Sequence, residues 1–308
     1  MTAFIFPGQG AQYVGMGKDF YEAFPIARET FQEGDQRLGF KLSDLIFNGP
    51  ADELTLTKNS QIAIYVMSVA LWRVLKEQMP EIKPAVIAGL SLGEYTALTA
   101  SGRLSFEDGI SLVRSRGLYM YEAGTAHPGT MAVCLGMSLQ QVQQEISSID
   151  GVWIANLNCP GQVVISGTIE GIAKATALLK EKGAKRVLPL DVSGAFHSGL
   201  MEEAKLKLKE KIDSIALNTS DIRLVMNATG DFAREEEIRN NMIEQVTSPV
   251  LWEKGIHAME ENGINRFIEI GCGKTLSGMN RKIGVKGETF SLEKIEDLEK
   301  LGAINGIA

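Results

Sequence analysis

One serine of the chain lies in a pattern typical of an activated nucleophile. Residues 85–100 read AVIAGLSLGEYTALTA, in which GLSLG places Ser91 midway between Gly89 and Gly93. An apolar segment typical of a strand precedes these five residues, and one typical of a helix follows them. Glycines at both ends let the strand and the helix approach closely, which exposes the serine at the apex of a strained turn. The pattern predicts that Ser91 is a nucleophile for acyl chemistry.

A serine hydroxyl needs a general base, because it is a poor nucleophile alone. The chain has three histidines. His257 lies in an amphipathic helical pattern, and His127 lies in GTAHPG, a segment typical of a linker turn. His197 lies in VSGAFHSG, between an expected strand and an expected helix. Loops of this kind often carry catalytic groups, so His197 is the candidate base.

Acyl chemistry also needs N–H donors for the oxyanion of the tetrahedral intermediate. In a turn of this type one donor is the residue after the serine, here Leu92. The other must come from a second loop. The segment PGQG at residues 7–10 follows an expected strand that would lie beside the strand before Ser91. The N–H of Gln9 is therefore a candidate donor, and a plain strand-ending turn is the alternative.

The order of strand and helix patterns predicts an α/β fold. Alternating strands and helices indicate a mostly parallel sheet, whose site lies at the carboxyl ends of the strands. Residues 125–191 instead show the order βαββαβ, typical of a ferredoxin-like unit. We expect residues 1–124 and 192–308 to form a hydrolase-like core, with 125–191 as an inserted small subdomain.

Individual elements can also be predicted. One helix is expected over residues 18–32 and a long apolar one over 60–78, closed by prolines. Ser105 and Asp108 have the spacing of a capping box at the start of a further helix.

Bulk composition argues against several classes of protein. The net charge of −7 over 308 residues disfavours a general nucleic-acid binder. The longest uncharged apolar run, Ile62–Trp72, is too short to cross a bilayer, and the N-terminal residues have no signal-peptide pattern. The three cysteines fit neither a disulfide framework nor a zinc spacing. We expect a cytoplasmic protein with no membrane, nucleic-acid or metal partner.

Positive charge gathers in one segment despite the acidic total. Residues 266–286 contain five basic side chains and one acidic side chain, that of Glu269. A solvated helix face is one interpretation, and a docking patch for an anionic partner is the other. The basic residues are Arg266, Lys274, Arg281, Lys282 and Lys286.

Seven segments, in order along nearly the whole chain, carry a resemblance to a known family. They are FPGQGAQ (6–12), GLSLGEY (89–95), SRGLYM (115–120), NLNCPGQVVISG (156–167), GAFHS (194–198), QVTSPVLW (245–252) and EIGCGKTLSGM (269–279). Together they resemble the malonyl-CoA:acyl carrier protein transacylases of fatty acid synthesis and the related acyltransferase domains of polyketide synthases.

The resemblance implies a role for each candidate. Ser91 would carry the acyl group as an ester, and His197 would act as its base. The N–H groups of Gln9 and Leu92 would hold the oxyanion. The backbone carbonyl of Gln245 would orient the histidine in place of a triad carboxylate.

The resemblance also implies a malonyl specificity. Arg116, in SRGLYM, would bind the free carboxylate of malonate, since a guanidinium pairs bidentately with a carboxylate. A helix-face salt bridge is the alternative for this arginine. Phe196 would crowd an α-methyl branch, which favours malonyl over methylmalonyl. Many members have a histidine where this chain has Leu90, so any help of that histidine in positioning the acyl group is absent.

The implied activity is a ping-pong transfer from malonyl-CoA to the phosphopantetheine thiol of acyl carrier protein, with release of CoA and without a metal or redox cofactor. Lys274, Arg281, Lys282 and Lys286 would dock the acidic carrier, and the lysines of residues 205–211 are the competing surface. Three alternatives stay open at this stage. They are a serine thioesterase or hydrolase, a free-standing acyltransferase of a polyketide pathway, and a non-catalytic carrier-binding scaffold.

Overall fold

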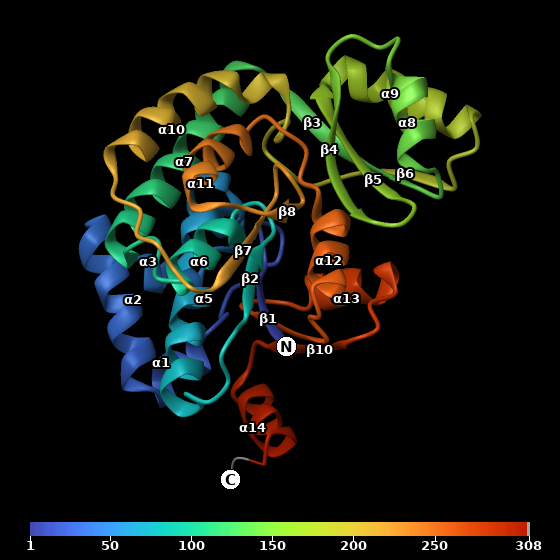
Figure 1. The fold of residues 1–308 in the computed structure, drawn as a ribbon. Coiled ribbons are helices and arrows are strands. Elements are labelled where there is room, and N and C mark those ends of the chain that lie inside the picture. The colour runs from blue at the N-terminus through green and yellow to red at the C-terminus, as the bar shows by residue number, and fades with distance from the viewer. Residues whose placement is uncertain (307–308) are drawn as a thin grey trace. The chain divides into compact units, whose positions relative to one another are not determined.

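A computed structural model describes residues 1–306 of the chain as a mixed α/β fold with two compact units (Figure 1). The first unit comprises Met1–Gly117, Ala216–Val225 and the chain from Met259 onward. The second comprises Leu118–Ile215 and Met226–Ala258. Residues 1–306 form two sheets, one of six strands and one of four.

The first unit is built on a parallel sheet. Its parallel strands lie in the order β10 (Glu288–Leu292), β9 (Arg266–Ile270), β1 (Thr2–Phe6), β2 (Val86–Gly89) and β7 (Arg223–Met226). The two-residue strand β8 (Asp231–Phe232) completes this six-stranded order next to β7. The two central strands read TAFIF and VIAG and are buried almost throughout. Such short apolar runs suit a parallel sheet that is covered on both faces.

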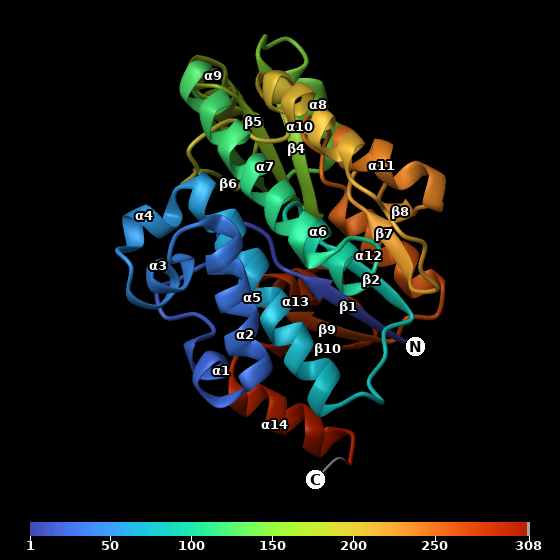
Figure 2. The ribbon, with the colours of Figure 1, turned by 90° about the vertical axis from the view of Figure 1, so that its left-hand side faces the viewer.

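Helices occupy the connections between these strands, as parallel pairing requires. They are α1 (Lys18–Ala23), α2 (Pro25–Leu38), α3 (Leu42–Asn48), α4 (Ala51–Thr55), α5 (Thr57–Gln78), α6 (Gly93–Ala100) and α13 (Thr275–Ile283). Helix α14 (Ile295–Ile304) follows the last strand, β10. Helix α5 runs alongside α2 (Figure 2) and is buried along most of its length. Helix α7 (Phe106–Ala126) begins in this unit. Within residues 1–306 no helix combines the length and apolarity that a membrane span requires.

The second unit contains an antiparallel sheet with the order β4 (Val152–Cys159), β5 (Gln162–Thr168), β3 (Gly129–Leu135) and β6 (Arg186–Pro189). Helices α8 (Leu139–Ile146) and α9 (Ile169–Glu181) share an apolar core with these strands. The other elements of the unit are a 3₁₀ turn (Gly199–Met201), α10 (Glu202–Ser214), β8 (Asp231–Phe232), α11 (Glu235–Glu244) and the start of α12 (Trp252–Glu261).

Some expected elements are confirmed and others are wrong. The helix expected over 60–78 is present and begins three residues earlier, at Thr57. The single helix expected over 18–32 is instead two helices. Phe24 is extended between them (φ −116°, ψ 121°), because the residue before a proline disfavours helical geometry. The turn expected at GTAHPG is partly wrong, since α7 continues to Ala126.

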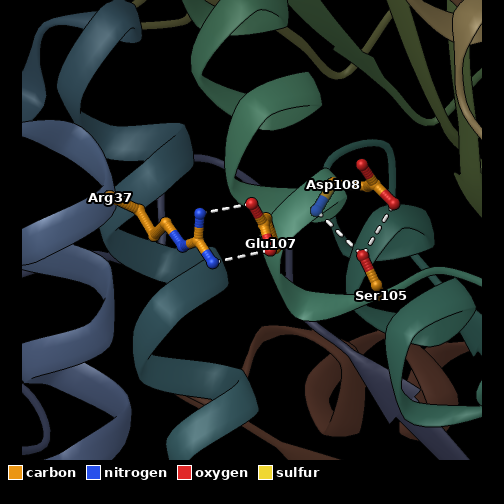
Figure 3. Close-up of polar contacts among 4 residues, drawn as sticks. All are labelled: Arg37, Ser105, Glu107 and Asp108. Carbon is orange, nitrogen blue, oxygen red and sulfur yellow. Dashed lines mark hydrogen bonds and ion pairs between the residues drawn. The ribbon is translucent and has the colours of Figure 1, made fainter.

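The start of α7 carries the serine half of the expected capping box. The Asp108 N–H donates to Ser105 Oγ at 3.0 Å, and the Ser105 hydroxyl donates to Asp108 Oδ2 at 2.7 Å (Figure 3). The serine therefore satisfies one of the N–H groups that a helix start leaves without an acceptor. Beside it, Arg37 pairs with Glu107 at the surface (Figure 3).

These two contacts should differ in their effect on stability. Ser105→Ala is expected to lower the free energy of unfolding by about 1 kcal/mol, because the N-cap is lost. Arg37→Ala should lower it by only about 0.5 kcal/mol or less, because both charged partners are half exposed. Urea unfolding of the two variants measures this. A larger loss from the arginine variant would contradict the ranking.

Candidate active site

Ser91 lies on a strained turn at the carboxyl end of β2. The strand ends at Gly89 and α6 begins at Gly93, and the serine between them has a φ of 51°, in the left-handed region. A Cβ on Gly89 would lie 1.9 Å from the carbonyl carbon of Gly93, and one on Gly93 would lie 2.2 Å from the Phe6 carbonyl oxygen. Only glycine fits at both positions, so the tight turn expected from the sequence is confirmed.

The loop that carries Gln9 packs beside this turn. Strand β1 pairs in parallel with β2, with Phe6 opposite Gly89, and the Leu90 N–H donates to the Phe6 carbonyl at 3.0 Å. A Cβ on Gly8 would lie 2.5 Å from the Leu90 carbonyl oxygen. Strand β1 is thus the neighbour of the strand before the serine, as expected, and Gln9 follows it directly.

Leu92 occupies the N-cap position of α6 and is fully buried. N–H groups at a helix start have no acceptor within the helix. The helix dipole adds a partial positive charge there. Such N–H groups suit the oxygen of a tetrahedral intermediate, which becomes negative during attack.

Helix α7 brings Arg116 to the nucleophile. The Arg116 Nη2 group donates to Ser91 Oγ at 3.0 Å, and the guanidinium carbon lies 5.6 Å from the centre of the Tyr95 ring. Arg116 is 1% exposed, and burial lowers its pKa because the cation is removed from water. Burial also raises the pKa of Tyr95, to about 12. A substrate carboxylate at this guanidinium would offset part of the desolvation.

Gln61 is a site residue that the sequence reasoning missed. The Arg116 Nη1 group donates to its Oε1 at 2.7 Å, and the side chain is 1% exposed. Its Nε2 group donates to Gln9 Oε1 at 3.3 Å, and Gln9 Nε2 donates to Thr57 Oγ1 at 3.1 Å. A signal was present, because Gln61 begins the apolar run QIAIYVMSVALW, where an amide is costly unless it is hydrogen-bonded.

The second unit holds the other candidates. His197 is 4% exposed and has a φ of 55°. Its Nδ1 lies 2.9 Å from the carbonyl oxygen of Gln245, the residue that follows α11. Because a carbonyl only accepts, Nδ1 carries the proton, and Nε2 of a neutral ring is then the basic nitrogen. The structure thus brings together His197 and the backbone carbonyl of Gln245, two of the candidates. Phe196 precedes the histidine and is buried.

The loop around His197 is fixed by its neighbours. The Ser198 hydroxyl donates to the Ala195 carbonyl at 2.6 Å, and Ser198 Oγ accepts the Leu200 N–H at 3.2 Å. The same serine therefore closes the loop and caps the 3₁₀ turn after it. A tightly bonded loop of this kind can hold an imidazole in one orientation.

The two basic surfaces differ in how far their charge is neutralised. On α10, Lys205 pairs with Glu244 and Lys207 with Glu203, both at 2.8 Å, and Lys209 pairs with Asp213. On α13, Lys274 is at the N-cap, and Arg281 and Lys282 are in the last turn. Within residues 1–306 we find no ion pair for Lys274, Arg281 or Lys286. The segment from Lys274 to Lys286, which contains α13, therefore has fewer of its positive charges neutralised by carboxylates than α10 has.

Comparison with known proteins assigns the chain to a family. Residues 3–286 match the family model described as "Acyl transferase domain". The malonyl CoA-acyl carrier protein transacylase of Bacillus subtilis is 47% identical over 302 residues, which are 96% of this chain and 95% of that protein.

Two solved structures agree with this. The malonyl CoA-acyl carrier protein transacylase of Clostridium perfringens superposes with a TM-score of 0.94 at 38% identity, covering 99% of this chain and 98% of that one. A malonyl-transacylase in complex with a type II polyketide synthase acyl-carrier protein superposes with a TM-score of 0.94 at 35% identity, covering 99% of both chains. On these likenesses, the chain belongs to the acyl transferase domain family, among the malonyl CoA-acyl carrier protein transacylases.

Proposed function

We propose that the protein transfers the malonyl group of malonyl-CoA to the phosphopantetheine thiol of an acyl carrier protein, through a malonyl ester on Ser91. One observation carries this proposal. A buried guanidinium, that of Arg116, lies 3.0 Å from the oxygen of a serine on a strained turn. A nucleophile next to a carboxylate receptor suits an acyl group that ends in a carboxylate.

In the first half of the reaction, the malonyl carboxylate pairs with Arg116. His197 Nε2 takes the proton of the Ser91 hydroxyl, and the serine oxygen attacks the thioester carbon. The N–H groups of Gln9 and Leu92 hold the oxyanion that forms. Collapse of this intermediate breaks the carbon–sulfur bond, and the CoA thiolate takes the proton from His197.

The second half reverses these steps with a different thiol. His197 accepts the proton of the carrier's phosphopantetheine thiol, and the sulfur attacks the serine ester. The same N–H groups hold the second oxyanion. Collapse releases malonyl carrier protein and returns the proton to Ser91. His197 keeps its orientation in both halves through the hydrogen bond from Nδ1 to the Gln245 carbonyl.

A transfer assay tests the function. Malonyl-, methylmalonyl- and acetyl-CoA are each mixed with the enzyme, with and without carrier protein. We expect malonyl transfer to dominate and CoA release to be slow without carrier. Rapid net CoA release without carrier would identify a thioesterase or hydrolase instead, and the absence of any acyl adduct would identify a scaffold.

We infer that the enzyme prefers malonyl-CoA to methylmalonyl-CoA, because the ring of Phe196, which precedes the histidine, is buried and would crowd an α-methyl branch. Leu90 cannot hydrogen-bond to an acyl group, so Arg116 provides most of the selectivity. We place the transfer in fatty acid synthesis. A polyketide pathway is the second candidate, because one similar structure holds a type II polyketide synthase acyl-carrier protein.

We propose that Lys274, Arg281, Lys282 and Lys286 dock the carrier protein. The charge of the segment from Lys274 to Lys286 supports this over α10, where three of the four lysines are paired with carboxylates. A charged docking surface acts mainly on encounter.

The double variant Arg281→Glu with Lys282→Glu is therefore expected to raise the KM for carrier protein at least about fivefold, with the KM for malonyl-CoA unchanged. Lys207→Glu with Lys209→Glu on α10 is the matched control and should change neither. Steady-state kinetics with each substrate varied in turn give both constants. A carrier KM within twofold of wild type would leave α13 as an ordinary solvated face.

We also propose the finer architecture expected from the sequence, with a hydrolase-like core at 1–124 and 192–308 and a ferredoxin-like subdomain at 125–191. The antiparallel order β4-β5-β3-β6, with α8 and α9 in the βαββαβ sequence, supports the latter. A cytoplasmic location fits three cysteines that are buried thiols.

A further inference from the structure

We propose that Gln61 is a positioning residue that couples carboxylate recognition at Arg116 to the oxyanion-binding loop at Gln9. The proposal rests on the function proposed above. The relay consists of four side chains, those of Arg116, Gln61, Gln9 and Thr57. Its successive hydrogen bonds measure 2.7, 3.3 and 3.1 Å.

The direction of every bond in the relay follows from the cation at its start. A guanidinium only donates, so Gln61 must present Oε1 to Arg116. The amide of Gln61 then has only its Nε2 group to offer to Gln9, which must answer with Oε1. Gln9 in turn presents Nε2 to the hydroxyl oxygen of Thr57. The charge of Arg116 thus fixes the orientation of two amides that would otherwise be free to flip.

Burial makes the relay hard to replace with water. Gln61 is 1% exposed and Thr57 is fully buried. A buried amide that loses one partner keeps an unsatisfied polar atom, which costs more than the bond itself contributed. A change in the position of the Arg116 guanidinium should therefore alter the hydrogen bonds of Gln9, and the loss of the Thr57 hydroxyl should do the same from the other end.

One helix, α5, supplies two of the four side chains of the relay. Thr57 and Gln61 are four residues apart on α5, so they lie on the same helix face. From this face Gln61 reaches Arg116 and Gln9, and Thr57 holds the far side of the Gln9 amide. Both polar atoms of the Gln9 side chain are therefore hydrogen-bonded, Oε1 to Gln61 and Nε2 to Thr57. These two bonds fix the side chain and so orient the backbone N–H of the same residue.

This geometry predicts how selectivity is expressed. A malonyl carboxylate would hold the guanidinium in place and keep Gln61 and Gln9 aligned for the oxyanion. A neutral acyl group would leave the guanidinium less restrained, and the Gln9 N–H would then be aimed less well. Discrimination against neutral groups should therefore lower kcat as well as raise KM.

The test separates the relay from simple support of Arg116. Thr57→Val removes the hydroxyl that accepts from Gln9 Nε2 and keeps both side chains of the bond between Arg116 and Gln61. It should lower kcat for malonyl transfer about three- to tenfold, with the KM for malonyl-CoA within twofold of wild type. Thr57→Ser keeps the hydroxyl and should restore kcat. Gln61→Met breaks both bonds and should change kcat and KM together.

Ser60→Ala is the matched control, a buried serine of the same helix outside the relay. It should leave both constants unchanged. Thermal unfolding of every variant checks that the fold is retained. If Gln61→Met does not fold, the comparison of Thr57→Val with Thr57→Ser alone tests the relay. A Thr57→Val enzyme with wild-type kcat, or a Gln61→Met enzyme changed only in KM, would overturn the relay.

A second readout does not depend on malonyl transfer. The rate at which a neutral fluorophosphonate modifies Ser91 uses the same N–H groups for its developing oxyanion. It should fall by a similar factor in Thr57→Val and recover in Thr57→Ser. If wild type reacts with this probe but transfers no malonyl group, the proposed function fails, and the labelling rates of the Thr57 pair still confirm or overturn the relay.

Discussion

Ser91→Ala is expected to abolish the malonyl-enzyme and to lower malonyl transfer at least about 10³-fold. The covalent route requires an oxygen that can form and release an ester, and alanine has none. The remaining N–H groups and Arg116 would still bind malonyl-CoA, so its affinity should change far less than kcat. Intact-protein mass spectrometry after mixing with malonyl-CoA measures the adduct, and carrier acylation measures the rate.

Ser214→Ala is a suitable control, since this exposed serine ends α10 and its hydroxyl donates only to the Lys211 carbonyl at 2.8 Å. It should retain the adduct and the rate. A malonyl adduct that survives Ser91→Ala would place the covalent step on another residue. Loss of transfer with an adduct of normal abundance would show that Ser91 serves only the second half of the reaction.

The serine turn could be predicted because its causes are local. Gly89 and Gly93 are required by backbone contacts at 1.9 and 2.2 Å, so the spacing alone reports the close approach of strand and helix. The strand before Gln9 could be paired with β2 for a similar reason, since both are short apolar runs followed by glycine loops. Local sterics and hydrophobic pattern therefore carry this half of the site.

Other parts depend on contacts that no local pattern contains. Gln61 acquires its role only because α7 and the loop of Gln9 meet α5. Strand β10 reads ETFSL, too short and too polar to be separated from a loop by its sequence, yet it pairs with β9 over five residues. The break between α1 and α2 at Phe24 could have been predicted from Pro25, because the residue before a proline disfavours helical geometry. The helical pattern on both sides of Phe24 instead predicts one continuous helix.

The largest change in specificity is expected from Arg116. Arg116→Ala should lower kcat/KM for malonyl-CoA by about 10²- to 10³-fold, because the substrate carboxylate would enter a buried site without its partner. The value for acetyl-CoA should fall far less, so the preference for malonyl should collapse. Arg116→Lys keeps the charge but not the bidentate fork, and it should lie between the two enzymes.

Arg114 provides a matched control on the same helix, two residues earlier. Its guanidinium donates to the Lys58 carbonyl at 2.5 Å and to Asn59 Oδ1 at 3.4 Å, and it lies over the Phe40 ring. Arg114→Ala should reduce stability while leaving the ratio of malonyl to acetyl kcat/KM unchanged. Parallel losses with both CoA esters in Arg116→Ala would mean that this arginine supports the serine turn, through its 3.0 Å bond to Ser91 Oγ, rather than reading the carboxylate. If the ratio of malonyl to acetyl kcat/KM falls in Arg116→Ala while acetyl transfer stays normal, the selectivity for malonyl comes from the Arg116 guanidinium, which α7 places beside Ser91.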